Sequence, residues 1–225
     1  MASAAGSLSK TLLRVAWFSI LLGLGMEVLL LTVAAFFKHS MGTQAIIADL
    51  VQKVAWASIV CTGVAVGLGA SRMRGPAMGL AGLIAAPIAF YIAKAAHKSV
   101  IQALSITPAA AAAGPSPMLL AGIKGAEYAL LGYLAARLAK RASAGLREHA
   151  LMGLFIGLTF GGLIVYLSVA MAADPLPLFA IISRCANEII FPVGCAAVLY
   201  TAQKVGEKNA EDSEASSDPA VESAE

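Results

Sequence analysis

The feature that most constrains this chain is a series of about six apolar runs, each close to 20 residues or longer and closed by charged residues, Pro or Gly. An α-helix needs roughly 20 apolar residues to cross the hydrocarbon core of a bilayer. Hydrophobic residues make up 59% of the chain and charged residues 13%, well below the roughly 25% of a soluble domain. The runs therefore predict an all-α, polytopic bundle of transmembrane helices.

The expected spans are residues 12–36, 53–71, 77–99, 118–138, 150–172 and 178–202. They assign residues 1–206 to the transmembrane bundle and leave no room for a separate soluble catalytic domain. Residues 207–225 hold seven acidic residues against one Lys, which predicts a disordered cytoplasmic tail. The stretch from Ser105 to Pro117, rich in Ala and Pro, is expected to be a flexible external linker.

Lys and Arg are distributed unevenly between the expected loops. One side, which comprises both termini and the second and fourth loops, carries Lys10, Arg14, Arg72, Arg74, Arg137, Lys140, Arg141, Arg147, Lys204 and Lys208. The other side carries only Lys38, Lys53, Lys94 and Lys98. Because cytoplasmic loops hold the excess of basic residues, we expect a multi-pass protein of the cell inner (plasma) membrane with both termini in the cytoplasm.

The second half of the chain matches the first at three places, in the same order. Residues 25–31 (GMEVLLL) match residues 125–131 (GAEYALL). Glycines at a four-residue spacing occur in the second and fifth runs, and single prolines, Pro87 and Pro192, lie near the centres of the third and sixth. The pattern favours a duplicated three-helix unit, which would be inverted because three is odd. Inverted repeats are typical of transporters and channels, whose sites lie at the repeat interface.

Pro87 and Pro192 are also candidate helix breaks. Each ring lacks an N–H and displaces the carbonyl four residues earlier, which belongs to Leu83 or Glu188. Within a membrane such a carbonyl needs another helix, water or a ligand. The alternative interpretation is a passive kink that packing accommodates.

Charged residues within the expected spans supply the candidate site. Three of the six acidic residues that precede the tail fall inside spans, and two basic residues lie one helical turn from an acid. A charged side chain at mid-membrane costs at least about 2.5–3.5 kcal/mol, so these groups are expected to face the bundle interior. The candidate substrate or proton site consists of Glu27, Lys124, Glu127, Arg184, Asn187 and Glu188.

When each basic residue is paired with an acidic residue on its own helix, one of the three acidic residues has no partner. Lys124 is expected to pair with Glu127, and Arg184 with Glu188. Glu27 has no basic residue within a turn of its own helix, so we expect it to lack a charge partner and to carry or exchange a proton. Structural ion pairs that only fix helix register are the alternative.

A further polar stretch precedes the second span. Ser40 to Lys53, which includes Asp49, is expected to form an amphipathic segment along the outer membrane surface.

Signatures of metals, cofactors and catalysis are missing from the sequence. The three cysteines are widely separated, the three histidines lie near span ends, and no G-x-S-x-G, H-E-x-x-H or Walker loop occurs. We therefore expect no metal and no cofactor, and enzymatic activity is disfavoured without being excluded. The basic excess is ordinary for an inner-membrane protein and predicts no nucleic-acid binding.

These features favour a small integral membrane transporter or channel with a charged mid-membrane site for an anionic or zwitterionic solute, with proton coupling as an option. We expect a homo-oligomer or a partner in a membrane complex. The alternative is a non-transporting scaffold, assembly factor or accessory subunit. A lipid-handling enzyme is a weaker third class.

Overall fold

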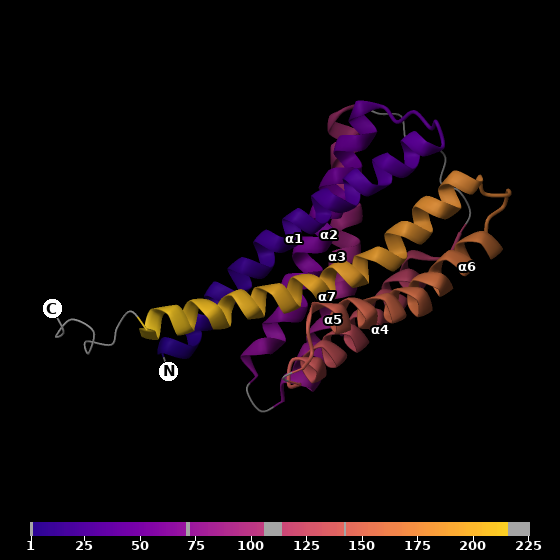
Figure 1. Cartoon of the computed structure of the whole chain (residues 1–225). Coiled ribbons are helices and arrows are strands. Elements are labelled where there is room, and N and C mark those ends of the chain that lie inside the picture. Colours follow the sequence, from indigo (N-terminus) through magenta and orange to yellow (C-terminus); the bar gives the residue numbers. More distant parts are fainter. Residues whose placement is uncertain (1, 71–72, 106–113, 142, 216–225) are drawn as a thin grey trace, which may run out of the picture.

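The computed structural model describes residues 2–70, 73–105, 114–141 and 143–215, and every regular element in these ranges is helical (Figure 1). The long helices are α1 (Ala2–Phe36), α2 (Thr43–Val66), α3 (Arg74–Ala103), α4 (Pro117–Leu138), α5 (Leu146–Ile156), α6 (Gly162–Ala170) and α7 (Leu178–Ala215). A short 3-10 helix, η1 (Gly67–Gly69), follows α2. A π-helical turn, η2 (Gly157–Gly161), joins α5 to α6, so these three elements form one continuous rod.

Five helical segments are long and apolar enough to cross a membrane: Leu8–Phe36, Thr43–Gly69, Arg74–Ala103, Leu146–Ala170 and Leu178–Gly206. The remaining long helix, α4, has 22 residues, carries Lys124 and Glu127 in its middle, and falls outside this set. The all-helical architecture predicted from the apolar runs is confirmed, with helices suited to a membrane.

The helices pack as a closed series. Each of α4, α3, α2, α1, α7 and α5 contacts the next in that order, and α5 also contacts α4. The connection at residues 37–42 and the connection at residues 171–177 lie at the same end of the bundle, which we call the 37–42 end. The start of α1 and the end of α7 lie near one another, away from that end (Figure 1).

Glycines set the closest approaches between helices. A Cβ at Gly82 of α3 would clash with the backbone carbonyl of Tyr128 in α4, and one at Gly67 would clash with the backbone of Met78 in α3. Similarly, a Cβ at Gly157 would clash with the Ile189 carbonyl of α7. Membrane helices associate through such small-residue faces because lipid supplies no hydrophobic drive between them.

The half of the bundle away from the 37–42 end is tightly packed. Its core is a cluster of fully buried apolar side chains that includes Val64, Met78, Tyr128, Leu131 and Leu199. These side chains come from α2, α3, α4 and α7, so this cluster packs the four helices against one another in the half of the bundle away from the 37–42 end.

Two boundaries differ from those expected. α2 is continuous from Thr43, so Ser40 to Lys53 is not a separate surface segment. The reason is that Asp49 and Lys53 find partners on neighbouring helices and can therefore lie inside the bundle. α7 continues to Ala215, into the segment expected to be a disordered tail, and residues 216–225 lie outside the described residues. Most of the expected linker, residues 106–113, also lies outside them.

Candidate functional site

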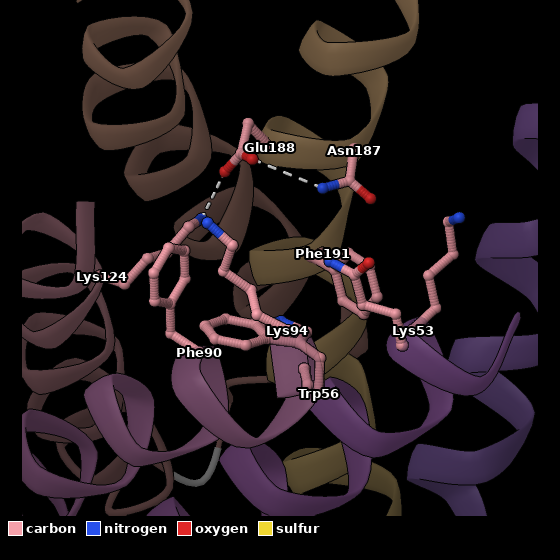
Figure 2. Close-up of a pocket in the computed structure, with 10 residues that line it drawn as sticks. Lys53, Trp56, Phe90, Lys94, Lys124, Asn187, Glu188 and Phe191 are labelled. Atoms are coloured by element: carbon pink, nitrogen blue, oxygen red, sulfur yellow. Dashed lines mark hydrogen bonds and ion pairs between the residues drawn. The ribbon is translucent and has the colours of Figure 1, made fainter. Parts of the chain in front are cut away.

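A cavity of about 110 Å³ lies between α2, α3, α4 and α7 (Figure 2). Its lining combines three aromatic rings with charged and amide side chains: Gln52, Lys53, Trp56, Phe90, Ala93, Lys94, Lys124, Asn187, Glu188 and Phe191. Figure 2 shows the rings of Trp56, Phe90 and Phe191 on one side and the polar groups of Asn187 and Glu188 on the other. We call the wall formed by these three rings the aromatic floor of the cavity, and the opposite wall is polar.

A second cavity of about 370 Å³ adjoins the first and shares Gln52, Lys53, Asn187 and Glu188 with it. Its other lining residues include Asp49 near the start of α2 and Ala180 near the start of α7. The second cavity thus extends from the shared residues toward the 37–42 end.

Lys124 is the centre of the charged site. Its Nζ lies 2.8 Å from Oε2 of Glu127 and 2.6 Å from Oε2 of Glu188. The same ammonium group lies 5.8 Å from the ring centroid of Trp56 and 5.9 Å from that of Tyr128, within range of a cation–π interaction. One buried cation therefore serves two carboxylates, one on its own helix and one on α7.

The two carboxylates differ in their surroundings. Glu127 is fully buried, and its Oε1 has no hydrogen-bond partner among the described residues. Glu188 lines both cavities, and its Oε1 accepts a hydrogen bond of 3.4 Å from Nδ2 of Asn187. Glu188 is therefore the member of the pair that a solute in the cavity can reach.

The backbone around Glu188 is held by a proline and a glycine. Pro192 cannot donate to the Glu188 carbonyl, which is thereby released from the helical ladder. A Cβ at Gly161 of η2 would lie 2.8 Å from that oxygen, so only glycine allows this approach. π-helical turns such as η2 occur frequently at functional sites.

Pro87 shows the same arrangement on α3. The carbonyl of Leu83, four residues earlier, lies against Gly125 of α4, where a Cβ would be 3.1 Å from the oxygen. Each released carbonyl therefore faces a glycine on a neighbouring helix. Both prolines lie in helices that remain continuous, so packing accommodates each of them.

Glu27 has a charge partner, contrary to the expectation from its own helix. Its Oε2 lies 2.7 Å from Nζ of Lys53 in α2, and both side chains are largely buried. Lys53 also lies 3.9 Å from Asp49, which in turn lies 3.1 Å from Nε2 of His97 in α3. A chain of polar contacts thus connects α1, α2 and α3 beside the cavity.

Arg184 does not join the buried centre. Its residue is exposed and lines the second cavity, and among the described residues Glu188 pairs with Lys124 instead. A long side chain near a helix end can reach a polar surrounding, whereas the buried Lys124 requires a carboxylate partner inside the bundle. The six candidate residues therefore separate into a centre of Lys124, Glu127, Glu188 and Asn187, a distinct pair at Glu27, and Arg184 on the second cavity's lining.

Sequence reasoning missed several residues of the site, above all Lys53, Lys94 and the three aromatic rings of the floor. A usable signal existed for Lys53. Asp49, Lys53 and Trp56 share one helical face that continues into the apolar run, so a single long helix would have placed Lys53 inside the span. No comparable signal marks Phe90 or Phe191, because apolar residues line both cavities and lipid-facing surfaces.

The described part of the chain holds no cluster of three or more His, Cys, Asp or Glu side chains arranged for a metal ion. The chain matches no protein-family model, and comparison with curated proteins and with solved structures finds no match. Function therefore has to be argued from the site.

Proposed function

We propose that this chain is a small multi-pass transporter whose solute site is the cavity between α2, α3, α4 and α7. The observation that carries the proposal is the ion pair between Lys124 and Glu188, which joins α4 to α7 at the wall of that cavity. Charges inside a membrane protein are costly and typically mark solute or ion pathways. Here a single chain encloses them beside a space that a small solute can occupy.

The site is open on one side of the bundle and closed on the other, as in one of the two conformations of an alternating-access transporter. The cavities extend toward the 37–42 end, while the opposite half is closed by the aromatic floor and the core around Tyr128 and Leu131. Passage requires α4 and α7 to separate on the closed side. The Lys124–Glu188 pair joins these two helices, so a solute that competes for it can couple binding to their movement.

The same group of charges around Lys124 is the proposed site of proton binding during transport. Glu127 and Glu188 share one ammonium group, which leaves one negative charge in excess when both are ionised. A proton on either carboxylate makes the centre neutral, and loss of that proton restores the excess negative charge. Glu127 and Glu188 therefore replace Glu27, which Lys53 already neutralises, as the proposed proton carriers.

The proposal includes six spans, with α4 as the sixth, and an inverted repeat of three helices. Both halves support the repeat, because Gly67 in the first and Gly157 in the second bring the middle helix of each half against its proline-containing helix. The basic residues favour cytoplasmic termini in the inner (plasma) membrane. The 37–42 end would then face outward.

A non-transporting scaffold or accessory subunit is the second candidate. Arg184 favours it, because an exposed charge near a helix end is available to another protein. The enclosed Lys124 centre favours the transporter, since a docking surface gains nothing from charges that a partner cannot touch.

The test uses purified protein in liposomes that contain a pH-sensitive dye. A gradient of a small solute is expected to drive proton movement in liposomes with the protein and not in empty ones. Glu127→Gln and Glu188→Gln should each reduce this proton movement at least tenfold, because the centre can no longer gain and lose a proton.

Asp174→Asn is the matched control, because Asp174 is an exposed carboxylate in the connection between α6 and α7. It should leave the flux unchanged. Proton movement that survives in both Gln variants would overturn the coupling. Absence of flux for anionic, cationic and zwitterionic solutes with folded protein would overturn transport itself.

A further inference from the structure

The cavity lining carries two opposite charges that are not balanced within the site. Glu127 and Glu188 share Lys124, so that centre has one negative charge in excess when both carboxylates are ionised. Lys94 lines the same cavity from α3, and among the described residues no carboxylate pairs with it. Its Nζ instead lies 5.1 Å from the ring centroid of Phe90.

The remaining cation of the lining does not alter this balance. Lys53 is neutralised by Glu27, which is buried and is not among the residues that line the cavity. A solute in the cavity therefore meets Glu188 as an available anion and Lys94 as an available cation. In Figure 2 the Lys94 side chain extends from the aromatic floor toward the side that carries Glu188.

We propose that the solute is a small zwitterion, whose cationic nitrogen binds Glu188 and whose anionic group binds Lys94. This inference rests on the proposed transport function and specifies its substrate class. A solute with only a negative charge would add to the excess at the Glu127–Glu188 centre. A solute with only a positive charge would be repelled by Lys94. A zwitterion compensates both charges at once.

The volume of the cavity and its aromatic floor further restrict which zwitterions can bind. The volume of about 110 Å³ accommodates roughly 7–11 water-sized groups at about 10–15 Å³ each, so the solute is a small molecule. The rings of Trp56, Phe90 and Phe191 offer contact to a short apolar portion. An amino-acid-like zwitterion of a few carbon atoms has these properties.

The experiment measures binding to the full chain in nanodiscs by calorimetry. The zwitterionic probes are L-alanine, β-alanine and glycine betaine; the singly charged probes are propionate and ethylamine, which lack the cationic and the anionic group of alanine. At least one zwitterion should bind at least tenfold more tightly than both singly charged probes, a difference of about 1.4 kcal/mol.

Two variants test the roles assigned to Glu188 and Lys94. Glu188→Gln should weaken zwitterion binding at least tenfold and remove the discrimination against propionate. Lys94→Gln should weaken it similarly and remove the discrimination against ethylamine. Lys98→Gln, which changes an exposed Lys one turn further along α3, should change neither affinity nor selectivity. If Glu188 and Lys94 had only structural roles, the two variants would lower stability, but they would not remove discrimination against propionate or against ethylamine.

The outcomes separate the substrate class from transport. If propionate or ethylamine binds as tightly as the best zwitterion, or if both variants keep the original selectivity, the zwitterion assignment is wrong. Transport still stands in that case if the tighter-binding probe crosses liposome membranes and Glu188→Gln slows it. If the folded protein neither binds nor transports any of the five probes, both proposals are wrong.

Discussion

Two of the ion pairs that involve buried charged residues join different helices. Glu27 of α1 pairs with Lys53 of α2, and Lys124 of α4 pairs with Glu188 of α7 as well as with its own neighbour Glu127. Such pairs contribute less to stability than their Coulomb attraction suggests, because both groups lose hydration. Their larger consequence is that removal of one partner leaves an uncompensated charge inside the bundle.

Lys53→Met is expected to lower the free energy of unfolding by about 3–5 kcal/mol, because it leaves Glu27 buried without a cation. Reversible unfolding in mixed micelles measures the effect. Lys98→Met, at an exposed position, should stay within about 0.5 kcal/mol of the parent.

The double variant Lys53→Met with Glu27→Leu distinguishes the charge from the packing. It should recover most of the loss, since apolar replacements of a buried ion pair are often neutral or stabilising. A double variant as unstable as Lys53→Met alone would show that the lost contact, and not the unpaired carboxylate, causes the destabilisation.

At this scale the sequence indicated most of the buried charged residues, although not Lys53, and it did not indicate how they pair. Lys124 and Glu127 could be paired from their spacing on one helix, and the structure shows that contact. The partners of Glu27 and Glu188 come from helices far away in the sequence. Helical spacing carries no information about such contacts, which is why Glu27 was expected to be alone and Arg184 to be paired.

At the scale of the elements, the interface between α3 and α4 positions Lys124 against the cavity. Gly75, Gly79 and Gly82 of α3 all lie against α4, with Gly82 against the Tyr128 carbonyl. Because Tyr128 lies one turn from Lys124, a shift of α4 at this point also moves the ammonium group away from Glu188.

Gly82→Ala is therefore expected to destabilise the protein by about 1–3 kcal/mol, since the added Cβ meets backbone that cannot rotate away. Gly122→Ala in α4 is the matched control, because a Cβ there has no neighbour within 4 Å. It should be neutral or stabilising by up to about 1 kcal/mol, as Ala is the better helix former. Thermal unfolding in detergent measures both; equal losses would contradict a specific close approach at Gly82.

The apolar runs predicted where helices occur, because length and hydropathy alone decide whether a segment can cross a bilayer. They predicted the ends less well. The run that contains α2 was expected to begin at Lys53, whereas the helix begins at Thr43. Hydropathy assigns Asp49 and Lys53 to water, and it cannot detect that His97 and Glu27 supply partners for them inside the bundle.

At the scale of the whole molecule, the cavities and the basic residues mark opposite ends of the bundle. The cavities extend toward the 37–42 end, whereas most Lys and Arg residues lie in or beside the opposite connections and termini. If the basic end is cytoplasmic, the solute site is reached from outside the cell.

Single cysteines in a variant without Cys61, Cys185 and Cys195 test this orientation. Ser40→Cys, in the exposed connection between α1 and α2, should react with a membrane-impermeant maleimide in intact right-side-out vesicles. Ser143→Cys, exposed in the connection between α4 and α5, should react only after permeabilisation. The reverse pattern would place the cavities on the cytoplasmic side. Because the site is closed toward the basic end, that result would change the direction from which the solute enters while leaving the Lys124 centre as its binding site.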